Sequence, residues 1–597
     1  NEKNMKSFIP DEDASRRLMA VARGRAYADL AVVNARMLNV YTGEILDGSQ
    51  IAVSDKWIAS VGRDASASIG PKTHVIDAAG NVVIPGLIEG HTHLVWLASV
   101  SEYLRYLIPG GTTTLISETL EAYPVAGLDG VIDVLASFKD QPIKLFGTAP
   151  AMVSISRAAE GIDSSHLASL VSREDVVGLG ESYWQALLQR PDTLLPAYAA
   201  VRGQRKTLEG HSAGASEKKL NAYVAAGISS CHEPISAQDV LDRIRLGLYV
   251  MIREGSIRRD LAAISKIVHM GVDCRRLILS TDGIAPDDLI AKGGLEYVLQ
   301  KAIDCGFDPV AAVQMATLNV AEHFGIDDLA GGIAPGRCAD MLVVPDLKTI
   351  EPRRVISNGR VVAEKGHLLV APRAHAYGPQ SRDTIRLGTD VDRERFAIAA
   401  PGRPSTVTVR VIDMVSDLVT RDAAYDMPVV GGRVAVDTAR DIITVAAIDR
   451  TRQPGKTFTG LIHGFGLARG ALAASSAWDS SDIIVVGADE GDMALAVNRI
   501  ADMQGGAVLC DGGRVVQEIP MPVLGIISDL PMETLASRLT ALKAAVRERG
   551  CPFPDPLLSL VALTGAAIPF FRICEEGLVD LKTGRTAGCF GDAPVDD

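Results

Sequence analysis

Two histidines stand one residue apart in IPGLIEGHTHLVW, residues 84–96. An apolar run leads into them, which predicts a strand that ends near His91 and His93. At such an end, the twist into the following loop lets both imidazoles turn toward one point. Imidazole is the commonest protein ligand for metals. The stretch therefore predicts a metal site at the end of a strand.

Four further segments place a metal-binding side chain after a short apolar run. They contribute Glu181 in GLGES, His211 in LEGHS, His232 in SCHE and Asp282 in STDG. Imidazole and carboxylate ligands without a thiolate suit Mn²⁺, Fe²⁺ or Zn²⁺. We expect these side chains to complete the site that begins at residue 91.

Six protein ligands are too many for one catalytic ion, because such an ion must keep an open position. They suit two divalent ions that share a carboxylate, since a carboxylate can offer one oxygen to each. The ligands are predicted to be His91, His93 and Asp282 on one ion, His211 and His232 on the other, and Glu181 on both.

A pair of ions would lower the pKa of a shared water from about 15.7 toward 7 and supply hydroxide at neutral pH. Asp282 could accept the proton as this hydroxide attacks a C–N or acyl centre, then pass it to the leaving group. General acid–base help of this kind contributes roughly 10²- to 10⁴-fold. The predicted chemistry is metal-dependent hydrolysis.

Repeated β–α alternation over residues 85–335 positions these side chains. Short apolar runs end in polar or ionisable residues, and helical patterns separate them. This alternation predicts a (β/α)₈ barrel. A doubly wound sheet is the alternative, but its ligands gather at one crevice, whereas here they follow many strands.

The flanks of this segment share a texture of short strands and turns. Residues 28–35 (ADLAVVNA) precede it and residues 340–345 (DMLVVP) follow it, which predicts a small β-sandwich built from both flanks. Strands and helices after residue 386 predict a further α/β domain. The expected divisions are 1–84 for the first flank, 85–335 for the barrel, 336–385 for the second flank and 386–597 for the C-terminal domain.

Composition narrows the functional class. The net charge is −13, and scattered Lys and Arg argue against nucleic acid as a partner. No apolar run reaches the roughly 18 residues that a membrane span needs. Eight cysteines without a CxxC motif are typical of reduced thiols in a cytoplasmic protein. We expect a cytoplasmic enzyme with a small-molecule substrate.

Longer stretches resemble the adenine deaminase family of the amidohydrolase superfamily. They include GHSAGASEKKLNAYVAAGISSCHE (210–233), MIREGS (251–256) and IAPGRCADMLVV (333–344). The similarity runs nearly the whole chain, through MATLNVAEHFGI (315–326) and GALAASSAWDSSDIIVVGADEGDMALA (470–496). It implies a binuclear hydrolase, usually with iron or manganese, that acts on a ring carbon bearing nitrogen. By analogy it also implies a homodimer or larger assembly.

The chain departs from this family around the ligands. Leu94–Val95–Trp96–Leu97 replaces Ile-Glu-Ser-Ser, and residues 118–121 (ETLE) replace Asp-Pro-His-Glu. Residues 281–283 (TDG) replace Thr-Asp-Asp, and residues 478–482 (WDSSD) replace His-Asp-Ser-His-Asn. Residues 182–184 (SYW) follow the bridging carboxylate, where the family has Asn or Met nearby. The residues of these stretches predicted to contact substrate are Trp96, Glu118, Glu121, Tyr183, Trp184 and Trp478, with ordinary packing as the alternative for each aromatic residue.

Two charged residues keep the family's pattern. Glu233 follows His232 and could carry a proton, bind a substrate nitrogen or orient a ligand. Arg253 in MIREGS could bind a substrate acid or pair with Glu254. The sequence leaves both alternatives open.

Three functions remain for such a site. The departures favour hydrolysis of an amide, lactam, lactone or N-acyl group in a substrate bulkier and more aromatic than adenine. Ordinary conversion of adenine to hypoxanthine and ammonia is the alternative. A metal-binding scaffold without activity is the third, and the complete ligand set argues against it.

Overall fold

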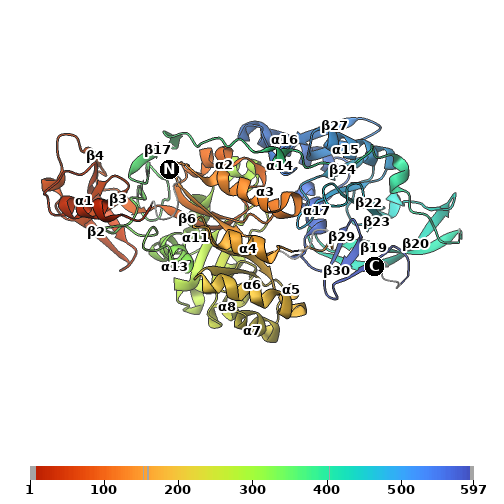
Figure 1. Ribbon diagram of the computed structural model, residues 1–597, viewed down its shortest axis with the longest axis horizontal. Helices are drawn as coiled ribbons and strands as arrows, with labels where there is room; N and C mark the ends of the chain where they lie inside the picture. The colour runs from red at the N-terminus through yellow and green to blue at the C-terminus, as the bar shows by residue number, and fades with distance from the viewer. Residues whose placement is uncertain (1–7, 152–153, 158–160, 403, 592–597) are drawn as a thin grey trace.

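The computed structural model describes residues 8–151, 154–157, 161–402 and 404–591. Three regions follow one another along its long axis (Figure 1). A β domain built largely from the N-terminal segment lies at one end, the α/β barrel lies in the middle, and the C-terminal region lies at the other end. Among the described residues, no helix combines the length and apolar character needed to cross a membrane.

The predicted barrel is confirmed. Its strands run parallel in two hydrogen-bonded groups, one of five strands and one of three. The N–H of Ser229 donates to the carbonyl of Leu208 over 2.9 Å and joins the groups, while the N–H of Asp282 donates to the carbonyl of His91 over 3.1 Å and closes the ring. The strands are β6 (Leu87–Thr92), β8 (Thr112–Ser117), β9 (Lys144–Ala149), β10 (Val176–Tyr183), β11 (Thr207–His211), β12 (Ser230–Cys231), β13 (Tyr249–Arg253) and β14 (Leu277–Ser280).

Burial on both faces explains the composition of these strands. Every residue of β10 (VVGLGESY) and of β8 (TTTLIS) is buried, as expected where parallel strands are covered by helices on the outside and side chains on the inside. Helices α2 (Val100–Leu107) and α8 (Ala237–Arg245) cover the barrel with one apolar side. Each begins at a serine whose hydroxyl accepts a backbone N–H of the first turn, which stabilises the helix start.

The two flanks of the barrel form one β domain, as predicted. β5 (Val82–Pro85) from the first flank pairs antiparallel with β15 (Met341–Val344) from the second, with Ile84 opposite Leu342. The strands make one continuous sheet in the order β18-β17-β16-β15-β5-β1-β2-β3, with β4 paired to β1. Side chains from both flanks meet in a single core, so the sheet folds over itself. The remaining strands are β1 (Leu30–Asn39), β2 (Glu44–Ser54), β3 (Trp57–Gly62), β4 (His74–Asp77), β16 (Arg354–Ser357), β17 (Arg360–Glu364) and β18 (His367–Leu368).

A mixed sheet forms the centre of the C-terminal domain. Its order is β21-β20-β19-β23-β22-β25-β24-β26-β27, and α15 (Glu490–Asp502) and α16 (Met532–Arg547) contact it. Its strands are β19 (Thr406–Met414), β20 (Thr420–Val430), β21 (Arg433–Val434), β22 (Ile442–Asp449), β23 (Thr457–His463), β24 (Ala471–Ala474), β25 (Asp482–Gly487), β26 (Gly506–Cys510) and β27 (Val515–Pro520). A small sheet of β29 (Phe571–Cys574), β30 (Gly577–Asp580) and β31 (Arg585–Ala587) follows.

Specific contacts fix this domain against the barrel. β28 (Ile527–Ser528) pairs with β7 (Leu97–Ala98), directly after Trp96. The connection between the domains is fastened to α3 (Ala122–Phe138), where the Asp133 carboxylate lies 2.8 Å from Nε2 of His375 and accepts the hydroxyl of Ser381 over 2.6 Å. One apolar core spans both regions. The C-terminal domain is therefore held at the barrel end that carries the predicted ligands.

Candidate metal centre

The predicted ligands all lie at the carboxyl ends of barrel strands. His91 lies near the end of β6 and His211 ends β11, while Glu181 lies near the end of β10. His232 and Asp282 follow β12 and β14 by one and two residues. Because the strands are parallel, these ends meet at one mouth of the barrel. Loops alone would not bring residues so far apart in sequence to one point.

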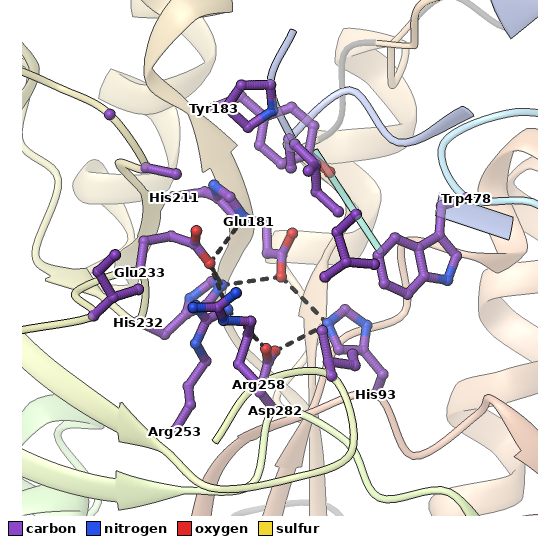
Figure 2. Close-up of a pocket in the computed structure, with 18 of the residues that line it drawn as sticks. His93, Glu181, Tyr183, His211, His232, Glu233, Arg253, Arg258, Asp282 and Trp478 are labelled. Atoms are coloured by element: carbon purple, nitrogen blue, oxygen red, sulfur yellow. Dashed lines mark hydrogen bonds and ion pairs between the residues drawn. The ribbon is translucent and has the colours of Figure 1, made fainter. Parts of the chain in front are cut away.

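Ligand atoms converge in two groups that share one carboxylate. Within each group, the candidate atoms lie within 4.8 Å of one another. Figure 2 shows the labelled members turned toward a common centre. The groups are His91, His93, Glu181 and Asp282, and Glu181, His211 and His232.

The spacing of these atoms fits divalent metals. Glu181 Oε1 lies 3.3 Å from Nε2 of His93 and 3.3 Å from Nε2 of His232, and Nε2 of His91 is 3.1 Å from Asp282 Oδ1. Ligands bound tetrahedrally at about 2.0–2.1 Å lie about 3.4 Å apart. Without metal ions, these carboxylate oxygens and imidazole nitrogens could lie this close only if enough of the imidazoles carried protons to donate to the oxygens. The donor set therefore suits cations at its centre.

Carboxylates behind the imidazoles orient them. Nδ1 of His93 bonds to Oε1 of Glu121, and Nδ1 of His91 lies 3.6 Å from Oε1 of Glu118. Each contact leaves Nε2 facing the centre, which is the usual arrangement around metal-bound histidine. Oε1 of Glu118 and Oε2 of Glu121 are buried without a hydrogen-bond partner in the described part of the chain. This excess of acceptors again favours positive charge.

The pKa values of the candidate ligands also indicate that the site favours positive charge. Burial lowers the pKa of His91, but hydrogen bonds to Asp282 and Glu181 outweigh it and raise this pKa to about 10. Burial raises the pKa of Glu181, but hydrogen bonds from His232, His91 and His93 hold it well below its usual range. Both shifts show that these carboxylates favour positive charge beside them, and metal ions bound there would displace protons.

A chain of charged groups runs from the first ligand group to the second. Nη1 of Arg253 donates to Asp282 Oδ2 over 3.0 Å and to Glu233 Oε1 over 2.6 Å. Glu233 Oε1 also lies 3.1 Å from Nε2 of His211. Arg253 is buried and contacts a third carboxylate, Asp260, at 3.5 Å. Its place between two acids of the site favours positioning over recognition of a substrate acid.

A cavity of about 380 Å³ opens beside this chain. Its floor carries the ligand groups, and part of its wall is apolar. The rings of Trp96 and Trp478 meet edge to face there, with centroids 6.2 Å apart. Trp478 comes from the C-terminal domain and lies across the cavity from Glu233 (Figure 2). The cavity is therefore lined by two domains.

The structure brings most of the predicted substrate residues to this cavity. It does not bring Glu118, which lies behind His91 and accepts the hydroxyl of Thr148 over 2.8 Å. It does not bring Trp184 either, because that indole turns away and donates to the carbonyl of Ala213 over 2.7 Å, with Lys219 over its ring. The predicted substrate or proton-handling residues that do line the cavity are Trp96, Glu121, Tyr183, Glu233, Arg253 and Trp478.

The sequence interpretation missed Asp479, which also lines the cavity. Its carboxylate accepts the hydroxyl of Tyr183 over 3.0 Å, and burial raises its pKa to about 7. A signal was present, since WDSSD keeps the Asp-Ser of His-Asp-Ser-His-Asn while the other three residues change. Asp479 is one of the two retained residues.

Comparisons with known proteins agree with this architecture. The amidohydrolase family model matches residues 82–362, and the adenine deaminase C-terminal domain model matches residues 417–585. An adenine deaminase of Moorella thermoacetica is 37% identical over 96% of this chain and 97% of its own. One of Clostridium botulinum strain Langeland is 34% identical over 95% and 96%, and adenine deaminase 3 of Rhizobium meliloti is 35% identical over 96% and 98%. Among solved structures, enamidase is 21% identical, with a TM-score of 0.44 over 58% of this chain and 99% of its own.

Proposed function

The chain belongs to the adenine deaminase family of the amidohydrolases, and we propose that it hydrolyses adenine to hypoxanthine and ammonia with two divalent metal ions. That it is a metal-dependent hydrolase follows from its family. One observation supports the finer statement: six side chains from five strand ends converge in two groups that share Glu181.

The two groups of side chains suggest which residues would hold each ion. His91, His93 and Asp282 would hold one, His211 and His232 the other, and Glu181 both. Mn²⁺, Fe²⁺ and Zn²⁺ suit these ligands. When bound, such ions lower the pKa of a water toward 7 and polarise the bond under attack.

Asp282 and Glu233 would handle the protons. Asp282 Oδ1 faces the ligand group, whereas Oδ2 is fixed by Arg253, so one oxygen stays directed at the reacting centre. Glu233 Oε1 lies beside the second group and shares the same Arg253 nitrogen. Arg253 thus fixes the positions of these two carboxylates relative to each other. They can accept a proton from water and deliver one to the leaving nitrogen.

Ammonia release tests this function directly. Protein loaded with manganese, iron or zinc should release ammonia from adenine, lose the activity on chelation and regain it when metal returns. Asp282→Asn provides the matched inactive form. Loaded protein that carries two ions yet releases no ammonia from adenine would contradict the proposal.

A larger substrate is the second candidate. The cavity of about 380 Å³ falls within the range of drug-sized ligand sites, roughly 300–1,000 Å³. Its wall of Trp96 and Trp478 offers a surface for a bulkier aromatic or apolar group. A panel of cyclic amides, lactones and N-acyl compounds, compared with adenine by kcat/KM, would decide between the candidates. If adenine has the highest kcat/KM of the panel, the larger substrate is excluded.

We also propose a cytoplasmic homodimer or larger assembly. All eight cysteines are unpaired, as expected in a reducing compartment. Cell fractionation would test the compartment, and light scattering during size-exclusion chromatography would test the assembly. A monomer, or recovery outside the cytoplasm, would contradict these statements.

A further inference from the structure

A turn of the C-terminal domain reaches into the barrel cavity. Trp478 and Asp479 precede β25 and both line the cavity. Both domains hold the turn. The N–H of Trp478 donates to the carbonyl of Val561 over 3.3 Å, and the hydroxyl of Ser154, from the barrel, donates to the carbonyl of Asp479 over 2.8 Å. The turn is thus fixed relative to the ligand groups.

Asp479 has a conformation that non-glycine residues rarely adopt. Its φ is 55°, in the left-handed region, and its side chain is only 4% exposed. Such strain persists where the surroundings enforce it and often marks a functional position. Asp282, at the ligand groups, shares this feature with a φ of 58°. The two aspartates contribute carboxylates to the same cavity from opposite domains.

The Asp479 carboxylate can still accept hydrogen bonds. Oδ1 accepts the hydroxyl of Tyr183 over 3.0 Å, and Oδ2 accepts the N–H of Ala566 over 2.8 Å. An ionised carboxylate offers about four acceptor positions, so two remain after these bonds. Arg572 has a charge interaction with this carboxylate, while its own N–H groups donate to backbone carbonyls. Asp479 therefore lines the cavity with acceptor positions beyond those that Tyr183 and Ala566 use.

An acceptor in this position suits one kind of substrate group. The ligand groups act on the carbon that bears the leaving nitrogen, and the indoles of Trp96 and Trp478 suit a flat ring. A purine packed against them carries one ring N–H, on its imidazole half, which does not include the reacting carbon. We propose that Asp479 determines specificity by accepting a hydrogen bond from this ring N–H, so that the C-terminal domain completes the site. This inference rests on the proposed function, because it assumes an aminated heterocycle as substrate.

Methylated purines test this role. Adenine with a methyl group on either imidazole nitrogen lacks the N–H but keeps the amino group. A site built around such a bond rejects an analogue that lacks it, and we expect the unmodified protein to prefer adenine by at least about 10²-fold in kcat/KM. In Asp479→Ala, this preference should fall to within about threefold, while metal content stays unchanged. Asp502→Asn, an exposed change in the same domain, should keep the full preference.

A purely structural aspartate would give another pattern. Its loss would lower the activity toward adenine and methylated adenine equally, and an unchanged ratio in Asp479→Ala would overturn the proposal. If that variant does not fold, Asp479→Leu has a similar volume but no acceptor, and it should still reduce the ratio at least about tenfold. An unchanged ratio in a folded Asp479→Leu would likewise overturn the proposal.

A binding measurement tests this inference independently of the proposed function. Trp96 and Trp478 line the cavity, so quenching of tryptophan fluorescence by adenine and by its methylated forms reports binding without turnover. If no ammonia is released but adenine binds more tightly than methylated adenine, and Asp479→Ala removes the difference, the proposed function fails and the inference stands. Equal binding of the purines, or no binding, overturns the inference.

Discussion

Histidine and carboxylate meet at two levels of the same barrel, with different outcomes. At the lower level, Glu209 lies two residues before His211 on β11. Its Oε1 is 2.9 Å from Nε2 of His323, and its Oε2 accepts the hydroxyl of Ser230. At the upper level, Glu181 Oε1 faces three imidazole nitrogens at 3.3–3.5 Å. The oxygens of Glu209 have hydrogen-bond partners nearby, whereas the upper cluster keeps carboxylate oxygens without a partner in the described part of the chain.

The difference separates a structural pair from a metal site. Residue types do not distinguish them, since LEGHS supplies one carboxylate to the lower level and one imidazole to the upper. What differs is the balance of donors and acceptors. Buried polar groups need partners, and only the upper level has more acceptors than the described chain can satisfy. Excess acceptors around a shared carboxylate predict cations.

The largest effect should follow from a change at the upper level. Asp282→Asn removes a charged ligand and a proton acceptor while it keeps the side-chain volume. We expect turnover to fall by at least about 10²-fold, the scale of general-base contributions, with the fold retained in circular dichroism. Asp304→Asn, an exposed change on α11 (Leu295–Asp304), serves as the control. Near-normal turnover by Asp282→Asn would contradict the role of Asp282 as the base.

A change at the lower level should act on stability instead. Glu209→Gln leaves His323 beside a neutral group, and an impaired buried hydrogen bond costs about 1–3 kcal/mol. We expect the urea midpoint of unfolding to fall while the metal content and the kcat of the folded enzyme stay unchanged. Loss of metal without loss of stability would show that the two levels are one site.

The sequence predicted the upper level well, because its residues stand at strand ends. The β–α alternation identified the barrel, and the spacing of polar residues after apolar runs singled out the six side chains that converge in two groups. The lower level was not predicted, since Glu209 and His323 lie more than a hundred residues apart without a recurring pattern. The same holds for Asp479, whose place depends on how the C-terminal domain packs. Trp184 shows the converse. It follows Tyr183 directly in the sequence, but its indole donates to the carbonyl of Ala213 and does not line the cavity.

The apolar wall of the upper level should have a smaller effect on activity. Trp96→Ala removes a large ring from the cavity, and lost burial of roughly 1.5–3 kcal/mol corresponds to about 10- to 100-fold in kcat/KM. We expect that loss for the native substrate, with unchanged metal content by elemental analysis. Equal kcat/KM for both forms would exclude packing of the substrate against this indole.

The smallest effect concerns pH. In the ion-free protein, hydrogen bonds to Asp282 and Glu181 outweigh burial and raise the pKa of His91 to about 10, so a proton is held there at pH 6–8 and must leave when a metal binds. Rising pH makes this displacement easier, and one proton corresponds to about a tenfold tighter Kd per pH unit. Competition with a metal indicator between pH 6 and 8 measures the slope. A Kd that does not change with pH would contradict the assigned ligand.

Metal stoichiometry tests the comparison between the two levels most directly, because at the upper level two groups of candidate ligands share one carboxylate. Protein prepared with excess manganese, iron or zinc and freed of loose metal should contain about two ions per chain by elemental analysis, as six ligands that include one shared carboxylate imply. Glu181→Gln should lower that ratio, and Glu209→Gln should not. A firm ratio of one or zero in the unmodified protein would contradict the account.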